Sequence, residues 1–200
     1  FSTIGETASA VKNLRVLGVF THLSSADGDD ATDRRITEAQ IKNFMEAELV
    51  VKNEKDVPFY AENSAALIKY GRFFDGARIG IALYGVNPVP GDKTPLLPVM
   101  TFRAAVIAIN TVKKGDFIGY SRGYRAKKDM RVAIISTGYA DGLPRALSNK
   151  GMIFCNGQFL KIVGKVSMDS VAVDAGDADV KIMDEVVVFG DEITVTDVAN

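Results

Sequence analysis

Along the first ninety residues, short apolar runs alternate with segments whose apolar residues recur at helical spacing. Strands are expected at residues 16–20, 58–61 and 77–84. Residues 6–14 are expected to be the end of a helix, and residues 64–69 a short helix. A further helix is expected to begin at Thr32 or Asp33, because Ile41, Phe44, Met45 and Leu49 recur at helical spacing. The repetition of strand, loop and helix predicts parallel βα units in which helices cover both faces of a sheet.

After about residue 90 the helical spacing disappears, and short segments rich in β-branched residues replace it. Four of the six prolines lie at positions 88, 90, 95 and 98, and a proline cluster at such a change is typical of a domain boundary. Strands are expected at 99–112, 117–120, 131–136, 152–154, 159–163, 167–173 and 185–189. Asn156-Gly157 predicts a hairpin turn, because both central residues of a type I′ turn need a positive φ. We therefore expect an α/β domain over residues 1–90 and a mainly β domain over 91–200.

Composition and charge exclude several classes of protein. The 200 residues carry 24 basic and 25 acidic side chains, and this balance offers no electrostatic footprint for nucleic acid or an anionic membrane. The single Cys155 cannot form an internal disulfide and is expected in the core. No apolar run is long enough to cross a bilayer, so we expect a cytoplasmic protein. Because the chain begins at Phe1 without a methionine, we expect it to be a piece of a longer one.

The candidate chemistry lies at the ends of the predicted strands. No glycine-rich nucleotide fingerprint occurs, and one histidine with one cysteine cannot build a zinc site. In parallel βα folds, functional residues gather at the carboxyl ends of strands. His22 follows the first strand, where a hydrogen-bonded core histidine is the simpler interpretation. Asn63-Ser64 opens a helix, as an ordinary cap or a phosphate site would. Arg78 lies in an apolar segment, where its burial is costly unless it is paired, and Gly80 would let a ligand approach the backbone.

Six segments, taken in order, resemble the alanine racemase family. They are Thr21-His22-Leu23-Ser24-Ser25-Ala26-Asp27, Asn63-Ser64-Ala65-Ala66, Arg78-Ile79-Gly80-Ile81-Ala82-Leu83-Tyr84-Gly85, Gly119-Tyr120, Gly138-Tyr139-Ala140-Asp141-Gly142 and Val163-Gly164-Lys165-Val166-Ser167-Met168-Asp169. No segment is specific alone, but their order is, and the resemblance covers nearly the whole chain. It implies the C-terminal part of a (β/α)8 TIM barrel followed by a mainly β domain, pyridoxal 5'-phosphate as cofactor, and a homodimer whose active sites are completed across the interface.

The resemblance also implies roles for single residues. Tyr120 matches a tyrosine that acts as a base from the partner subunit, His22 the histidine placed against it, and Arg78 the arginine that faces the pyridine nitrogen. Cofactor phosphate binding is implied for Ser64, Gly80 and Ile81, carboxylate binding by the backbone amide for Met168, and lining of the substrate channel for Asp27 and Tyr139.

The resemblance has gaps that bear on activity. The family's cofactor-binding lysine, an arginine for the substrate carboxylate and a late phosphate-binding tyrosine have no match here, and we expect them before Phe1 or after Asn200. A polypeptide limited to these residues is therefore expected to be inactive. Tyr60 stands where the family often has histidine, and Ser121 where it usually has glycine.

The implied activity is racemisation of L-alanine to D-alanine for peptidoglycan synthesis. A serine or broad-specificity amino-acid racemase remains an alternative, because the residues present do not separate the substrates strongly. A catalytically silent binding protein on the same fold is a second alternative, although the joint presence of Tyr120, His22 and Arg78 argues against it. A decarboxylase on the related barrel fits less well, because residues 138–142 and 167–169 look like the racemase versions.

Overall fold

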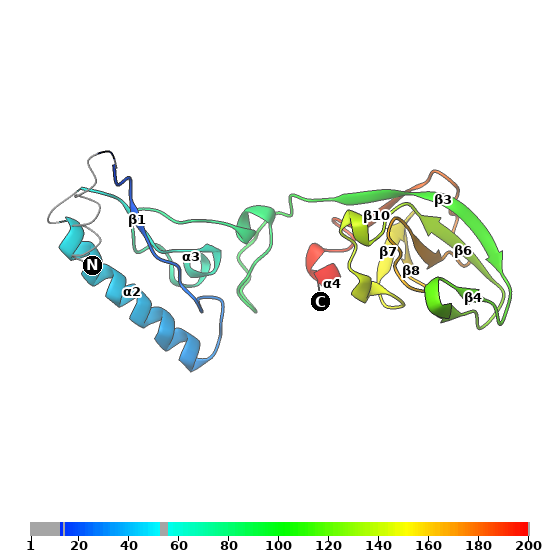
Figure 1. Ribbon diagram of the computed structural model, residues 1–200, viewed down its shortest axis with the longest axis horizontal. Coiled ribbons are helices and arrows are strands. Elements are labelled where there is room, and N and C mark those ends of the chain that lie inside the picture. The colour runs from blue at the N-terminus through cyan, green and yellow to red at the C-terminus, as the bar shows by residue number, and fades with distance from the viewer. Residues whose placement is uncertain (1–12, 14, 53–55, 200) are drawn as a thin grey trace. The chain divides into compact units, whose positions relative to one another are not determined.

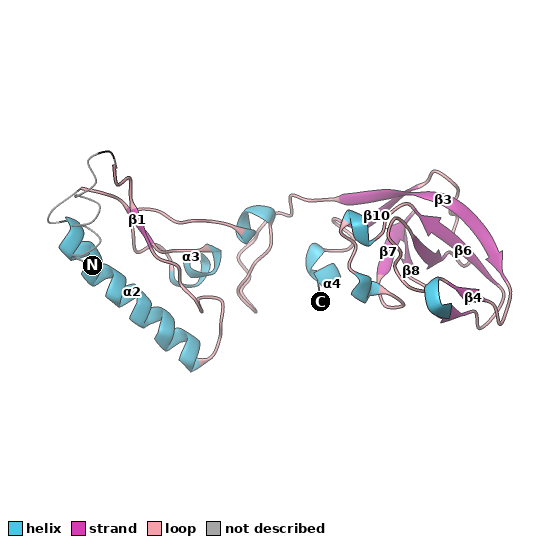
Figure 2. Cartoon of the chain, viewed as in Figure 1, coloured by secondary structure: helices cyan, strands magenta, loops and turns pink. Residues whose placement is uncertain are grey.

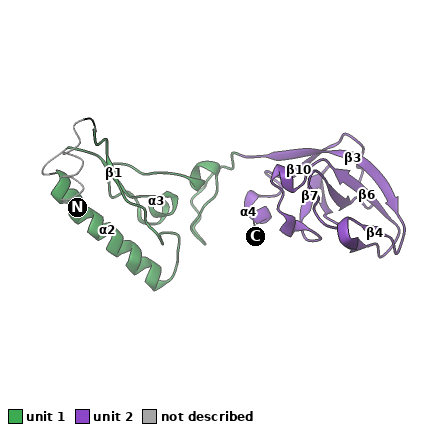
Figure 3. Ribbon diagram, in the orientation of Figure 1, with its two compact units in different colours: residues 1–99 green, residues 100–200 purple. Residues whose placement is uncertain are grey.

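The chain forms two compact units, residues 1–99 and 100–200 (Figure 3). The computed structural model describes residues 13, 15–52 and 56–199. The helix expected to end within residues 6–14 lies outside the described residues. Among the described residues, the two longest helices belong to the first unit, whereas the second unit is built mainly of strands (Figure 2). Each unit has a hydrophobic core of its own.

The largest helix, α2 (Ala31–Lys52), begins earlier than expected. Asp30 caps it, because its carboxylate accepts a hydrogen bond from the Asp33 amide at 2.7 Å. Met45 and Leu49, expected on the core face, are 37% and 69% exposed in this unit. Leu49 lies about 140° around the helix axis from the buried Phe44, since each residue turns the helix by about 100°. The buried face consists of Thr37, Ile41, Phe44 and Ala47.

The first unit contains short parallel strands, as the βα pattern predicts. Strands β1 (Val19–Phe20) and β2 (Phe59–Tyr60) pair in parallel, and each leads toward a loop and a helix (Figure 1). After β2 comes α3 (Ser64–Tyr70), capped by Asn63, whose side chain accepts from the Ala66 amide at 2.9 Å.

The prediction of a third strand at residues 77–84 is wrong. A single parallel bridge joins Tyr60 to Gly76, and the Arg78 amide donates to the Glu62 carbonyl at 2.8 Å. The chain then turns at Gly80, whose φ and ψ of −112° and −96° are not those of a strand, and Ile81–Tyr84 forms a 3-10 helix. The apolar run therefore predicts a strand over eight residues, of which only the start follows the sheet.

The second unit is a six-stranded antiparallel sheet. Its order is β8 (Gln158–Lys161), β7 (Met152–Cys155), β10 (Glu185–Phe189), β3 (Phe102–Val112), β6 (Met130–Ile135) and β9 (Val171–Asp174). A bridge between Ile162 and Val173 links the chain after β8 to β9, so the sheet closes on itself. The hairpin predicted at Asn156-Gly157 is confirmed: it joins β7 to β8, with φ of 47° and 79° at the two turn residues.

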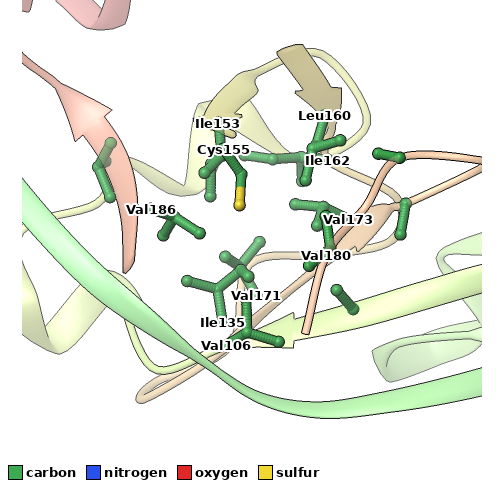
Figure 4. Close-up of a cluster of buried hydrophobic side chains, with 14 of the residues drawn as sticks. Val106, Ile135, Ile153, Cys155, Leu160, Ile162, Val171, Val173, Val180 and Val186 are labelled. Carbon is green, nitrogen blue, oxygen red and sulfur yellow. The ribbon is translucent and has the colours of Figure 1, made fainter. Parts of the chain in front are cut away.

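The closed sheet surrounds an aliphatic core (Figure 4). Val106, Ile135 and Ile153 have no exposed surface, and Cys155 is buried among them as expected. Burial raises the pKa of the Cys155 thiol. Outside this core lie a small hairpin of β4 (Phe117–Ile118) and β5 (Tyr124–Arg125), and the short helix α4 (Val195–Ala199). In the described part of the chain, no helix is both long enough and apolar enough to span a bilayer.

Candidate active site

A polar pocket of about 390 Å³ opens where β1 and β2 end in the first unit. The loop after β1, the start of α3 and the segment before the 3-10 helix line it. Six residues singled out in the sequence are among its lining: His22, Asp27, Ser64, Arg78, Gly80 and Ile81. Segments up to sixty residues apart therefore meet at one end of the parallel strands, where βα folds place their functional groups.

Arg78 is held at the end of β1 by three contacts. Its Nη2 donates to the Thr21 carbonyl at 2.7 Å and contacts His22 Nδ1 at 3.1 Å, and its guanidinium lies 4.7 Å from the centre of the Phe20 ring. Arg78 Nε is buried and has no hydrogen-bond partner among the described residues. The guanidinium therefore retains one buried donor that no described protein group satisfies.

The Arg78 contact determines which tautomer of His22 the pocket favours. A guanidinium can only donate, so His22 Nδ1 must accept and its ring proton lies on Nε2. The His22 side chain is exposed in this unit. The interpretation of His22 as a buried core histidine is therefore wrong, because it lies at the pocket rim against a cation.

Ser64 organises a second part of the pocket lining. Its hydroxyl oxygen accepts hydrogen bonds from the Gly80 amide at 3.0 Å and the Ala82 amide at 3.3 Å. The hydroxyl proton is then free to point toward an anion. A Cβ built at Gly80 would meet no atom within 4 Å, so open space lies beside this backbone. A hydroxyl donor and exposed backbone next to open space are suited to binding a phosphate.

Sequence reasoning missed Glu62, which orders the segment that carries Arg78. The Glu62 side chain is fully buried, and its Oε1 accepts hydrogen bonds from the amides of Phe73 and Phe74 at 2.5 and 3.0 Å. Its carbonyl accepts from the Arg78 amide. A carboxylate placed between a buried strand and a helix start was the available signal, because such a group is costly unless it is hydrogen-bonded.

The remaining three predicted residues lie in the second unit and are exposed there. The exposed fractions are 72% for Tyr120, 45% for Tyr139 and 55% for Met168. Tyr139 and Met168 are neighbours, because the Tyr139 amide donates to the Ser167 carbonyl at 2.9 Å and the Ala140 amide to the Met168 carbonyl at 3.0 Å. Exposed aromatic and apolar side chains on such loops are candidates for contact with a ligand or a partner.

Tyr120 was expected to end a strand, but it begins a tight turn instead. Strand β4 stops at Ile118, and φ is positive at Gly119, Ser121 and Arg122, with values of 76°, 54° and 56°. Two non-glycine residues in the left-handed region are a source of strain, and strained backbone of this kind clusters at functional sites.

Comparison with known proteins covers both units. A family model described as the alanine racemase N-terminal domain matches residues 1–88, and one described as the alanine racemase C-terminal domain matches residues 99–200. Alanine racemases of Helicobacter pylori (strain Shi470) and Mannheimia succiniciproducens are 37% and 35% identical, over 92% and 94% of this chain and 51% and 52% of their own lengths. The chain thus spans about half the length of the curated relatives it matches.

Solved structures of alanine racemases also match this chain over about half of their own length. The alanine racemase of Streptomyces coelicolor has a TM-score of 0.88 at 28% identity, over 99% of this chain and 55% of its own. The enzyme of Bartonella henselae, solved with covalently bound pyridoxal phosphate, has a TM-score of 0.81 at 32% identity, over 99% and 53%.

Proposed function

This chain belongs to the alanine racemase family, and from that premise we propose that the whole protein interconverts L- and D-alanine with pyridoxal 5'-phosphate as cofactor. The described residues are the C-terminal part of a TIM barrel and a mainly β domain. The observation that carries the proposal is the pairing of Arg78 with His22 at the strand ends, beside the Ser64 hydroxyl and the open backbone at Gly80.

The pocket fits the cofactor on two independent features. The Ser64 hydroxyl and the Ile81 amide would bind the phosphate next to open space at Gly80, and the Gly80 amide would join them by exchanging its hydrogen bond to Ser64 Oγ for one to the phosphate. Arg78 would face the pyridine nitrogen, and its buried Nε lacks a protein partner. When bound, pyridoxal phosphate withdraws electrons from Cα and makes the Cα proton acidic.

Arg78 would tune that chemistry by its fixed charge. A guanidinium remains protonated at neutral pH, so Arg78 would donate a hydrogen bond to the ring nitrogen but would not hand over a proton. By leaving the ring nitrogen unprotonated, Arg78 would limit electron withdrawal into the ring and disfavour transamination. His22 and the Thr21 carbonyl both contact Nη2 and hold the guanidinium in place.

Racemisation needs a proton acceptor and donor on each face of Cα. The Tyr120 hydroxyl is the group proposed for one face, delivered into the pocket of the partner subunit in a homodimer. Met168 would bind the substrate carboxylate through its backbone amide, and Asp27 and Tyr139 would narrow the channel to small substrates. The exposure of Tyr120, Tyr139 and Met168 in the second unit is the observation that supports a partner.

The base for the other face is the family's lysine, which has no match in these 200 residues. The same proposal, through the resemblance, puts the enzyme in the cytoplasm and makes D-alanine for peptidoglycan its product. Serine remains an alternative substrate to alanine. Its hydroxyl adds little volume to the alanine methyl group, so the size of the channel discriminates weakly between alanine and serine.

Purifying the whole protein and following optical rotation with L-alanine, L-serine and L-lysine tests the proposal. We expect visible absorbance from bound cofactor and the highest kcat/KM with alanine. Higher turnover of serine would favour the broad-specificity alternative. If the protein shows no turnover and no visible absorbance, the proposal is contradicted and a silent binding protein is favoured.

A further inference from the structure

The turn that carries Tyr120 is weakly supported by packing. Residues 119–122 are all exposed, and φ is positive at Gly119, Ser121 and Arg122. A turn of this kind is not stabilised by a buried side chain, and its backbone is strained. The position of the Tyr120 hydroxyl therefore depends on the groups that hold the turn from outside.

One side chain performs that task. Asn149 Nδ2 donates to the Gly123 carbonyl at 3.0 Å, and Asn149 Oδ1 accepts from the Gly164 amide at 2.7 Å. Among side chains in the described part of the chain, Asn149 is the only one that hydrogen-bonds to residues 119–123. It thus joins the end of the Tyr120 turn to the segment that leads to Met168.

Glycines bring those two segments close enough for one amide to span them. A Cβ at Gly119 or at Gly123 would lie 3.1 Å from the Lys165 amide nitrogen, and a Cβ at Gly164 would lie 3.0 Å from the Ile118 carbonyl oxygen. Asn149 itself has a φ of 61°, a conformation that asparagine tolerates better than most residues. Its backbone is thus held in an unfavourable conformation that presents the amide to both segments.

We propose that Asn149 is a positioning residue for Tyr120, acting through the Gly123 carbonyl and the Gly164 amide. The inference rests on the proposed function, because it assigns Asn149 to the racemase reaction. A carboxamide is required at this position, since the bridge needs a donor on one side and an acceptor on the other. Aspartate would keep the acceptor but lose the donor.

The test uses the whole protein with two matched substitutions, Asn149→Gly and Asn156→Gly. Asn156 also has a positive φ, 47°, and its Nδ2 donates to the Asp179 carbonyl and to Asp184 Oδ2, both at 2.8 Å. Glycine tolerates both backbones, so each variant loses two side-chain hydrogen bonds without new strain. Only Asn149 is bonded to the Tyr120 turn.

We expect kcat/KM for alanine to fall about 10- to 100-fold in Asn149→Gly and to stay within about twofold in Asn156→Gly, because a displacement of about 1 Å can cost a factor of this size. Visible cofactor absorbance should be unchanged in both. L- and D-alanine have equal free energies, so kcat/KM must fall equally in both directions. The Cα-deuterium isotope effect on kcat/KM distinguishes the two directions of the reaction. In Asn149→Gly it should rise for the enantiomer whose Cα proton Tyr120 removes.

Asn149→Asp provides the second arm, and it carries the test if Asn149→Gly does not fold. It should be slowed at least about tenfold, because the Gly123 carbonyl has lost its donor. Equal kinetics and isotope effects in Asn149→Gly and Asn156→Gly, or wild-type kinetics in Asn149→Asp, would overturn the inference while wild type still racemises alanine. An inactive wild type would overturn the proposed function itself.

Discussion

At the scale of single residues, Arg78 shows how geometry limits substitution. Its guanidinium Nη2 contacts both the Thr21 carbonyl and the His22 ring, whereas Nε has no hydrogen-bond partner among the described residues. A lysine carries the same charge on one nitrogen and cannot replace two nitrogens held in a fixed plane.

Arg78→Lys in the whole protein should therefore lower kcat/KM for alanine about 10- to 100-fold, the equivalent of one charge-assisted hydrogen bond. Keto-acid formation from alanine, measured in parallel, should rise relative to racemisation. Arg72→Lys is the matched control, because Arg72 donates to the backbone carbonyls of Phe74 and Asp75 and is not among the residues that line the pocket. An Arg78→Lys enzyme that is as fast as Arg72→Lys would contradict the role of Arg78.

Ser121 is the second residue where local geometry makes a prediction. Its φ of 54° places it in the left-handed region, which glycine adopts without a steric penalty. Ser121→Gly should raise the free energy of unfolding by up to about 1 kcal/mol, the gain from relieved strain less the entropy that glycine adds to the unfolded chain. Thermal unfolding of the whole protein measures it.

Ser170→Gly serves as the control for Ser121→Gly, since Ser170 is not among the described residues with a positive φ. That substitution should destabilise, because glycine loses more conformational freedom on folding and relieves no strain. Equal destabilisation by both substitutions would show that Ser121 is not strained.

Sequence reasoning found the residues whose position in a pattern is informative. His22 follows a predicted strand, Ser64 opens a helix and Arg78 is a charged residue within an apolar run, and the structure brings all three to one pocket. Glu62 and Asn149 were missed, because both act on backbone groups far away in sequence. The identity of those groups depends on tertiary contacts that no local pattern encodes.

At the scale of elements, a carboxylate joins the long helix to the parallel strands. Asp75 Oδ2 accepts from the Phe59 amide in β2 at 2.8 Å and from Lys52 Nζ at the end of α2 at 3.0 Å. The amide of Phe59, followed by the Lys52 ammonium, holds the pKa of Asp75 below its ordinary value of 3.8. The deprotonated form is therefore the one that folding favours.

A carboxyl with a lowered pKa in the folded state stabilises above its unfolded pKa, and loses that contribution as the pH falls through its folded pKa. The free energy of unfolding should thus drop as the pH is lowered from about 5 to about 2, and drop less steeply in Asp75→Asn. Urea titrations of both proteins across this range measure it. Identical slopes would show that Asp75 is not part of the acid response.

The type of element was easier to predict than its limits. Helix α2 was evident because 22 residues offer many turns of periodic pattern, and the Asn156-Gly157 turn because its backbone demands are specific. The segment 77–84 failed because its apolar run is the same whether the chain continues as a strand or turns at Gly80. The pairing of β3 with both β10 and β6 also lies beyond local pattern, because register depends on partners distant in sequence.

At the scale of the whole molecule, each unit is organised around its own core. The change from helical to β-rich texture near the proline cluster predicted an α/β part followed by a β part, and the family comparison supports that order. The closed sheet was not predictable, because the bridge between Ile162 and Val173 joins segments by tertiary contact alone.

The half-length of the chain relative to its curated relatives leads to a prediction at this scale. A polypeptide of these 200 residues, mixed with pyridoxal phosphate and treated with borohydride, should carry no specific lysine adduct by mass spectrometry. The reason is that the resemblance leads us to expect the family's cofactor-binding lysine outside these 200 residues. One stoichiometric adduct on Lys12, Lys42, Lys52 or Lys69 would show that the lysine was misplaced.

The buried thiol in the β core has a practical consequence. Cys155 is 1% exposed, and burial raises its pKa, so alkylating reagents leave it untouched in the folded state. It is the only cysteine in these 200 residues. Within this 200-residue segment, a cysteine introduced at an exposed position would react with a maleimide dye while Cys155 would not, so a fluorescent or spin probe can be attached at one chosen site without first replacing Cys155.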